Sequence, residues 1–255
     1  AGWQTAAVSD DSRGAGSGPR RVAFVTGCAS GIGRAVAERF RDEGATVVGF
    51  DLRGEGPDGV EVVAGDVTDR AAVEAALAGV VEAHGRLDVV ANVAGVPQFG
   101  RVEDIDDAEW DRVLAVNLTA PFLVSRAALP HLRATRGCIV NVASVAGLEG
   151  QAYTAAYCAS KGGLVMLTRA LALELAADGV RVNCVCPAAV DTPLLAEVAP
   201  RIPADADRRL LDRLEMPTPG LVSPQDVAAA VAYLAGDAAR MVTGVALPID
   251  GGRSA

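Results

Sequence analysis

From Arg21 onward, short apolar runs alternate with longer amphipathic segments. The apolar runs are rich in β-branched residues and predict strands at 22–26, 46–51, 60–64, 87–92, 138–144, 180–186 and 245–249. The amphipathic segments between them predict helices at 32–43, 70–84, 107–132, 153–177 and 224–235. Strands that are apolar throughout and alternate with helices are typical of a parallel sheet buried on both faces. The pattern therefore predicts an α/β fold, a doubly wound parallel sheet with helices on both faces.

Two segments depart from this alternation. Residues 1–20 are rich in Gly, Ser, Asp and Ala and lack the apolar run of a secretory signal, so we expect a flexible N-terminal extension. Residues 188–220 contain five prolines and a short helical pattern around 204–214. Loops of this length are usually functional, and we expect a lid, with an insertion of no functional role as the alternative. No linker divides residues 21–255, which predicts a single Rossmann-type domain.

Composition and charge exclude several classes of protein. Of the 255 residues, 51% are hydrophobic and 22% are charged, which is enough apolar content for a substantial core and too much for global disorder. No stretch of about 20 residues lacks charges or turn signals, so we expect no membrane partner. The net charge is −9, with 23 basic and 32 acidic residues. This balance disfavours a nucleic-acid partner, because such proteins usually present a basic face.

The cysteines give no sign of a disulfide framework or a metal centre. There are five, scattered along the chain, and we expect free thiols in a reducing cytoplasm. We expect Cys184 and Cys186 to point to opposite faces of their strand and so to make a poor metal pair. With only two histidines in the chain, the sequence predicts no metal site.

A glycine-rich turn follows the first predicted strand. Residues 26–33 read TGCASGIG, and a predicted helix starts directly afterwards. Glycines at such a turn let the backbone approach a pyrophosphate, whose charge is favoured at a helix N-terminus. A glycine-rich loop alone is weak support, and the spacing here is GxxxGxG rather than GxGxxG. Strand, loop and helix nevertheless occur in the required order, which predicts a dinucleotide site.

Two carboxylates are placed to contact the adenosine half of that dinucleotide. Asp51 ends the second predicted strand, where it could accept hydrogen bonds from both ribose hydroxyls and would repel a 2′-phosphate. The next residue is Leu52 rather than an arginine, which favours NAD over NADP, although Arg53 leaves NADP open. Asp66 follows the third predicted strand and is placed to meet the adenine edge. A solvated strand end or turn is the alternative interpretation of both.

The candidate catalytic groups are a tyrosine, a lysine, a serine and an asparagine. Tyr157 and Lys161 are four residues apart in a predicted helix, so their side chains share one face. Ser144 ends the strand 138–144, and Asn117 lies in the helix that precedes it. A tyrosine has an ordinary pKa of about 10, and a nearby ammonium favours its phenolate, which could exchange a proton with a substrate oxygen. A serine hydroxyl could hold that oxygen while charge develops.

Each of these four residues also has an ordinary structural interpretation, such as a core tyrosine or a cap serine. Lys161 adds an independent argument, because the chain has 22 arginines and only this one lysine. Lysine differs from arginine as a compact ammonium with three directed donors. Its position one turn after a tyrosine therefore supports a catalytic role.

Together these motifs resemble the short-chain dehydrogenase/reductase family in its compact single-domain form. The resemblance runs from about residue 21 to the end and rests on residues 26–33 (TGCASGIG), 66–67 (DV), 92–95 (NVAG), Asn117, Ser144, 157–161 (YCASK), 181–192 (RVNCVCPAAVDT) and 249–252 (IDGG). It implies a seven-stranded Rossmann sheet and NAD(P)-linked oxidation of alcohols or reduction of carbonyls. Two positions depart from the family: Val93, where it usually has Asn, and Ala188, where it usually has Gly. We expect local repacking at Val93 and a negative φ at Ala188.

The resemblance also implies residue roles. Tyr157 would be the acid/base, Lys161 would lower its pKa and bind ribose, Ser144 would orient the substrate, and Asn117 would hold a water of a proton relay. The residues implied to bind the cofactor are Gly27, Ser30, Gly31, Ile32, Gly33, Asp51, Leu52, Asp66, Val67, Asn92, Ala94, Gly95, Tyr157, Lys161, Pro187, Val190 and Thr192.

The substrate pocket is expected to form from residues 96–100, 145–153 and the lid. Apolar lid residues such as Leu194 and Leu195 fit a hydrophobic secondary alcohol or ketone. Three polar residues could read substrate hydroxyls or face solvent, and Tyr153 could line the pocket or the core; the three are Gln98, Glu149 and Gln151.

Three functions stay open at this point. The leading hypothesis is an NAD-dependent secondary-alcohol dehydrogenase acting on a small molecule. The alternatives are a reductase of 3-oxoacyl thioesters on a carrier protein and a non-catalytic dinucleotide-binding protein. An acidic carrier would need a basic patch, which the net charge of −9 disfavours. The family resemblance further implies a homo-oligomer, a tetramer or a dimer.

Overall fold

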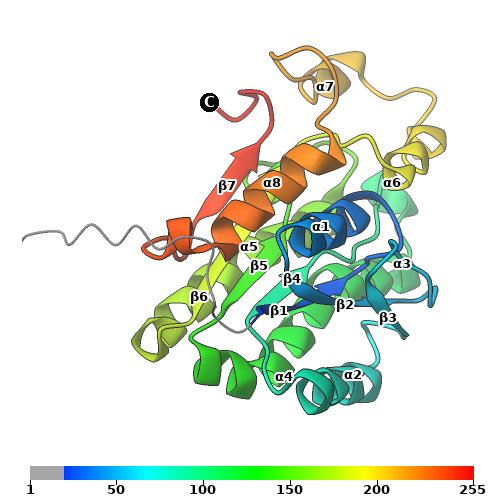
Figure 1. Cartoon of the computed structure of the whole chain (residues 1–255). Coiled ribbons are helices and arrows are strands. Elements are labelled where there is room, and N and C mark those ends of the chain that lie inside the picture. Colours follow the sequence, from blue (N-terminus) through cyan, green and yellow to red (C-terminus); the bar gives the residue numbers. More distant parts are fainter. Residues whose placement is uncertain (1–19) are drawn as a thin grey trace, which may run out of the picture.

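A computed structural model describes residues 20–255, so the predicted extension lies almost wholly outside the described residues. Seven parallel strands form one sheet in the order β3-β2-β1-β4-β5-β6-β7 (Figure 1). The strands are β1 Val22–Thr26, β2 Thr46–Asp51, β3 Glu61–Ala64, β4 Val89–Asn92, β5 Cys138–Val142, β6 Arg181–Pro187 and β7 Ala246–Ile249. The strand order reverses direction between β1 and β4. At such a point the loops at the carboxyl ends diverge and leave a crevice for a ligand.

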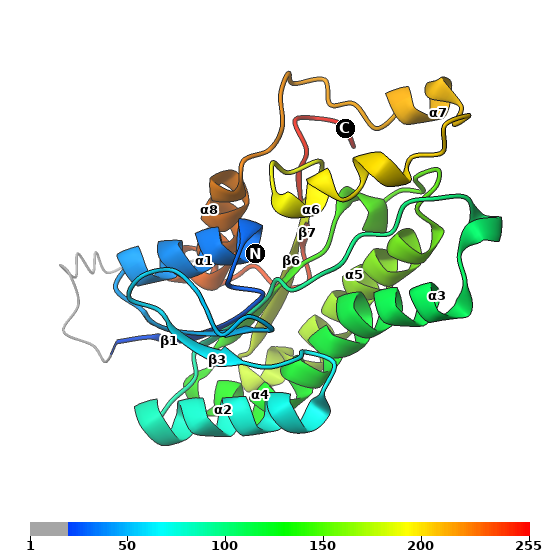
Figure 2. The ribbon, with the colours of Figure 1, turned by 90° about the vertical axis from the view of Figure 1, so that its right-hand side faces the viewer.

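Helices cover both faces of the sheet, as predicted. The helices are α1 Gly31–Asp42, α2 Arg70–His84, α3 Asp107–Leu114, α4 Ala120–Thr135, α5 Ala155–Leu175, α6 Pro193–Ala196, α7 Arg208–Asp212 and α8 Pro224–Ala235. Figure 2 shows α1 and α8 on one face and α2, α4 and α5 on the other. The doubly wound fold class is therefore confirmed.

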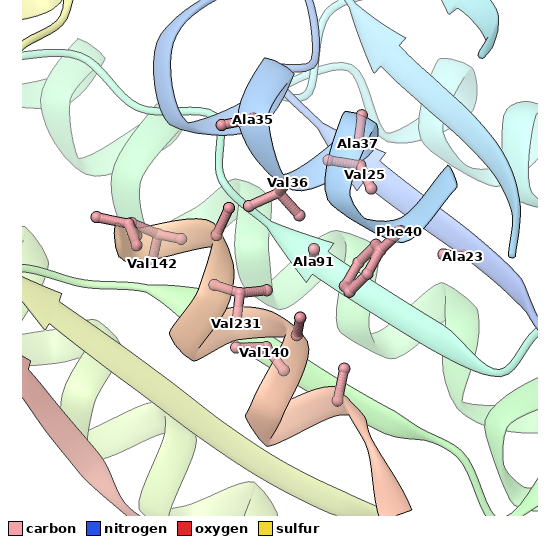
Figure 3. Close-up of a cluster of buried hydrophobic side chains, with 14 of the residues drawn as sticks. Ala23, Val25, Ala35, Val36, Ala37, Phe40, Ala91, Val140, Val142 and Val231 are labelled. Atoms are coloured by element: carbon pink, nitrogen blue, oxygen red, sulfur yellow. The ribbon is translucent and has the colours of Figure 1, made fainter. Parts of the chain in front are cut away.

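The core on the α1 and α8 side explains why these strands are apolar throughout. Val36 and Phe40 of α1 and Val231 of α8 pack over strand residues that include Val25 and Val140 (Figure 3). Every residue of β1, β4 and β5 is buried. Because these strands are covered on both faces, they cannot show the alternation of a half-exposed strand.

Local sequence signals set the ends of several helices. The Asp69 side chain accepts hydrogen bonds from the backbone of Ala71 and Ala72 at the start of α2, and Gly85 ends that helix in a left-handed conformation. At the start of α8, Ser223 and Asp226 form a reciprocal capping box ahead of the buried helical face. These helices begin and end where the sequence predicts.

The predicted continuous helix at 107–132 is wrong in one respect. A π-helical turn, Ala115–Thr119, separates α3 from α4 and contains Asn117. Within residues 20–255, one helical stretch, Asp107–Thr135, is long and apolar enough to cross a membrane by length and composition alone. Its residues Val124, Ala128 and Leu132 are buried in a hydrophobic cluster with residues of the sheet, as expected for a helix of a protein core.

The expected orientation of the β6 cysteines is also wrong. Cys184 and Cys186 belong to one cluster with Leu164 and Val165 of α5, because residues two apart in a strand share a face. Within residues 20–255, no group of three or more His, Cys, Asp or Glu side chains is arranged to hold a metal. The negative φ expected at Ala188 is confirmed, since the non-glycine residues with positive φ in the described chain are Arg136 and Tyr153.

Residues 188–220 form a segment that we call the lid segment, which lies beyond the carboxyl ends of the strands (Figures 1 and 2). It carries α6 and α7, and α7 is shorter than the helical pattern predicted around 204–214. The side chains of Arg101 and Asp205 form an ion pair of 2.7 Å that ties the segment to the body of the protein. The hydroxyl of Tyr153 accepts a further hydrogen bond from the backbone of Asp207 at 2.9 Å.

Candidate active site

A cavity of about 740 Å³ opens at the carboxyl ends of the strands, beside the reversal of strand order. Its walls come from the glycine-rich loop, the ends of β2, β4, β5 and β6, one face of α5 and the lid segment. This is the place where open parallel sheets bind ligands.

The glycines of the loop 26–33 are required by close backbone contacts. Gly27 has φ +72°, and a Cβ there would lie 2.8 Å from the Cα of Ala94. A Cβ at Gly33 would lie 2.0 Å from the carbonyl oxygen of Gly27. The absence of Cβ atoms at these glycines therefore allows the start of α1 to lie close to the end of β1. The Ser30 side chain does not cap the start of α1. The first backbone N–H groups of α1 are therefore available at the cavity, where they suit a pyrophosphate.

Asp51 lies at the end of β2 and faces the same cavity. Its carboxylate accepts hydrogen bonds from the backbone N–H groups of Ala29 and Arg53, each at 3.0 Å. The first of these bonds fixes the acidic group against the glycine loop. A carboxylate held there suits the ribose hydroxyls of a dinucleotide, so the residues present fit the expected cofactor.

Ser144, Tyr157 and Lys161 line the cavity together. Ser144 follows β5 and caps the turn Val145–Gly147 through a bond to the N–H of Ala146. Tyr157 and Lys161 lie on α5, and the Lys161 ammonium is 5.8 Å from the centre of the Tyr157 ring. That ammonium also donates to the carbonyl oxygen of Val142 at 2.8 Å. The strand end and one helix face thus bring the three predicted catalytic groups into one place.

Burial controls the pKa values of this group. Burial raises the pKa of the Tyr157 phenol, and a hydrogen bond with Ser144 opposes the rise. Burial also lowers the pKa of Lys161 to about 8. The expected lowering of the Tyr157 pKa by Lys161 is therefore not seen in the protein by itself. The rise has desolvation as its largest cause, because burial disfavours the charged phenolate.

Asn117 lies behind these residues and not on the cavity wall. Its side chain binds both backbone groups of Val96, at 2.9 and 3.0 Å, and donates to the Ser160 hydroxyl at 3.2 Å. A Cβ at Gly95 would lie 3.3 Å from the Asn117 side-chain oxygen and 3.6 Å from the Lys161 nitrogen. Asn117 therefore positions the loop after β4, close to Lys161 of α5.

Comparison with known proteins agrees with this site. A family model described as enoyl-(acyl carrier protein) reductase matches residues 27–254. Meso-2,3-butanediol dehydrogenase of Serratia marcescens is 40% identical over 244 residues, covering 92% of this chain and 95% of that protein. Cis-4-hydroxycyclohexanecarboxylate dehydrogenase of Sinomonas cyclohexanicum is 41% identical over 248 residues, covering 92% and 97%. The chain belongs to the short-chain dehydrogenase/reductase family.

A solved structure of the same family supports the fold and the cofactor class. The structure of 3-ketoacyl-(acyl-carrier-protein) reductase from Brucella melitensis, complexed with NADH, matches with a TM-score of 0.83 at 34% identity. The match covers 92% of this chain and 98% of that one. This short-chain dehydrogenase/reductase is accordingly an oxidoreductase of a family that binds nicotinamide dinucleotides.

Most of the residues singled out from the sequence line the cavity of this dehydrogenase/reductase. They are Gly27, Ser30, Gly31, Ile32, Gly33, Asp51, Leu52, Asp66, Val67, Ala94, Gly95, Gln98, Ser144, Gln151, Tyr157, Lys161, Pro187, Val190, Thr192, Leu194 and Leu195.

Four others lie elsewhere. Besides Asn117, the Asn92 side chain is buried in the core, where it donates to Asn141 at 2.8 Å. Tyr153 packs on Phe99, accepts a hydrogen bond from the lid segment and is not one of the residues that line the cavity. Glu149 does not line the cavity, but it forms an ion pair with Arg253, which does line it. These differences reflect side-chain direction, which spacing along the chain does not specify.

The residue in contact with Glu149 is Arg253, which the sequence analysis missed. Its side chain is 8% exposed, lines the cavity and forms an ion pair of 2.6 Å with Glu149. It directly follows the motif 249–252, but no local pattern links it to Glu149, far earlier in the chain. Val93, one of the two departures from the family pattern, packs against the apolar cluster between α1 and the sheet.

Proposed function

We propose that this protein is an NAD-dependent dehydrogenase that interconverts a secondary alcohol and its ketone. The observation that carries the proposal is the meeting of Ser144, Tyr157 and Lys161 in one cavity with the glycine loop and Asp51. The relatives support the reaction class, because the proteins from Serratia marcescens and Sinomonas cyclohexanicum are both named as dehydrogenases of hydroxyl-bearing compounds.

The residues of the chain suggest how each group acts. When bound, the nicotinamide accepts a hydride during alcohol oxidation and supplies one during ketone reduction. Tyr157, as the phenolate, takes the proton of the substrate hydroxyl during oxidation, and as the phenol it returns a proton to the ketone oxygen. The Ser144 hydroxyl donates a hydrogen bond to the same oxygen as negative charge develops on it. Lys161, held by Val142, keeps its charge close to the phenol and stabilises the phenolate.

The preference for NAD over NADP rests on the end of β2. The Asp51 carboxylate faces the cavity and would repel a 2′-phosphate. Leu52, which is 74% exposed, offers no donor to such a phosphate. Arg53 is exposed, and its backbone N–H is already bound to Asp51.

A reductase of 3-oxoacyl thioesters is the second candidate, favoured by the name of the Brucella melitensis protein and the description of the family model. An acidic carrier protein would dock on free basic groups near the cavity mouth. Arg101 is paired with Asp205, and both Arg112 and Arg201 are paired with Glu109. The two carboxylates neutralise part of the positive charge of these three arginines, and the net charge of the chain is −9, so we favour a small-molecule substrate.

A panel of secondary alcohols, assayed by the appearance of NADH, tests the proposal. The panel includes polyols, steroids and 3-hydroxyacyl thioesters, and we expect turnover with at least one small alcohol. Tyr157→Phe should keep NAD binding, measured by fluorescence, and lose about 1,000-fold or more of the turnover, since no other group replaces the acid/base. Unchanged turnover in that variant would exclude the mechanism. Binding of NAD with no turnover of any alcohol by the unaltered protein would favour the non-catalytic alternative.

We also propose that the protein acts as a homo-oligomer, a tetramer or a dimer, in the cytoplasm, without nucleic-acid or membrane partners. The five cysteines are free thiols, and four of them are buried, which suits a reducing compartment.

A further inference from the structure

Two side chains on the cavity wall carry buried nitrogen atoms that have no hydrogen-bond partner within residues 20–255. Gln98 is 2% exposed, and its Nε2 has no partner, although its Oε1 accepts from the N–H of Ala156 at 3.2 Å. The Arg253 side chain is 8% exposed, and its Nε has no partner. Buried donors are nearly always paired in native proteins, and leaving one unpaired costs stability. Each nitrogen is therefore free to donate to an acceptor other than the described residues of the chain.

Both donors are fixed close to the catalytic elements. Gln98 is bonded to Ala156, the residue before Tyr157. Arg253 is held by its ion pair with Glu149 and by a bond of 3.2 Å to the carbonyl oxygen of Leu214. The backbone of Glu149 is in turn bonded to the turn that follows Ser144. One donor is thus tied to the tyrosine helix and the other to the serine turn, and both residues line the cavity.

The charges around Arg253 indicate which acceptor fits. Glu149 is paired with the guanidinium, and the buried carboxylate of Asp250, three residues earlier, also lies within electrostatic range. Two carboxylates around one guanidinium leave an excess of negative charge. A ligand carboxylate would add to that excess, whereas a hydroxyl or carbonyl oxygen would accept from the free N–H groups without adding charge.

We propose that Arg253 and Gln98 bind a second, uncharged oxygen of the substrate, so that the enzyme prefers diols and hydroxyketones to alcohols with a single oxygen. The inference rests on the proposed function, because it concerns the same cavity, and it makes Arg253 and Gln98 determinants of specificity. Arg253 and Gln98 bind this second oxygen only, and neither residue takes part in the oxidation of the first hydroxyl.

Three compounds of the same ring size test this preference: cyclohexanol, cyclohexane-1,2-diol and 2-hydroxycyclohexanecarboxylate. In the unaltered enzyme we expect kcat/KM to be at least about 10-fold higher for the diol than for cyclohexanol, and lowest for the hydroxy acid. Arg253→Met should reduce the ratio of diol to cyclohexanol by about 10- to 100-fold, the range for one hydrogen bond to a charged donor. Gln98→Met should reduce it by about 3- to 10-fold, since that donor is neutral.

Two further variants separate binding from structure. Arg253→Lys keeps a charge for Glu149 but has no Nε donor, so it should lower the same ratio while retaining the melting temperature. Arg240→Met removes an exposed arginine remote from the cavity and should leave the ratio unchanged. An equal loss for diol and cyclohexanol in the Arg253 variants would show a structural role and overturn the proposal. A preference of the unaltered enzyme for cyclohexanol or for the hydroxy acid would overturn it as well.

Calorimetry of diol binding to the NADH-loaded protein distinguishes this proposal from the proposed function. If no alcohol is oxidised but diol affinity still falls in Arg253→Met, the subsite stands and the dehydrogenase assignment fails. If alcohols are oxidised and neither the rate ratio nor the affinity depends on Arg253 and Gln98, the dehydrogenase stands and the subsite fails. Absence of any diol binding also overturns the subsite.

Discussion

Lys161 shows how a single buried residue can combine a proposed catalytic role with a cost to stability. It is 4% exposed, and burial lowers the pKa of its ammonium to about 8. Its one hydrogen bond within the described residues, to the Val142 carbonyl oxygen, only partly replaces the water it has lost. The unfavourable position is understandable if the charge acts on Tyr157 and the substrate, because functional groups are often held in costly environments.

The cost of burying Lys161 gives a pH dependence. Between pH 8 and 10.5 the unfolded chain holds the proton more tightly than the folded chain, so stability rises with pH in this window. Lys161→Met lacks this titration. The difference in unfolding free energy, wild type minus variant, should be constant below pH 8 and increase by about 3 kcal/mol up to pH 10.5. Urea denaturation of the cofactor-free proteins at several pH values measures it, and a difference that stays flat throughout would contradict a buried ammonium.

At the scale of elements, junctions rather than regular segments place the functional groups. Asp51 comes at the end of β2, and Ser144 lies two residues beyond β5. The π-helical turn Ala115–Thr119 directs Asn117 into the loop after β4. Such a turn adds one residue to a helical repeat and often marks a functional site. The hydrophobic period of 107–132 does not reveal it, because both flanking helices keep their own apolar faces.

The end of β2 carries the prediction on cofactor preference. Asp51→Ala combined with Leu52→Arg removes the carboxylate and supplies a partner for a 2′-phosphate. We expect the ratio of kcat/KM for NADP to that for NAD to rise by about 10- to 100-fold. Arg53→Ala is the matched control, and it should leave the ratio unchanged. No shift in the double variant would mean that another residue reads the ribose.

At the scale of the whole molecule, helix α5 leaves apolar side chains exposed. Leu173 and Met166 of α5 are 83% and 59% exposed. The opposite face of α5 carries Tyr157 and Lys161 and packs on β6. Exposed apolar groups on a helix are typical of an association surface, and the family resemblance points to a second copy of this chain as the partner.

This surface predicts the assembly state. Leu173→Glu places a charge on the exposed face of α5. If the protein forms the proposed oligomer through this face, we expect the variant to form smaller species, because a buried unpaired carboxylate is costly. Light scattering coupled to size-exclusion chromatography measures the mass. Val102→Glu changes a residue that is 71% exposed and lies outside α5, and it should leave the assembly intact. A mass that is the same for wild type and Leu173→Glu would place the contact elsewhere.

The sequence by itself determined the fold class and the candidate catalytic set of this protein. Apolar runs and amphipathic segments are local patterns, and they defined all seven strands to within two residues at each end. The glycine loop, Asp51 and the pair Tyr157 and Lys161 were recognisable because each has a fixed spacing on one element or at its end. These features depend on contacts between near neighbours in the chain, which a sequence displays directly.

Only the tertiary structure decided where distant side chains meet. Arg253 reaches Glu149 and the cavity because β7 pairs with β6 and brings the C-terminal residues beside the serine turn. Asn92 turns into the core, Tyr153 turns to the lid segment, and the pKa of Tyr157 rises, all through packing between elements. Long-range contact and desolvation are properties of the folded molecule, and no spacing along the chain encodes them.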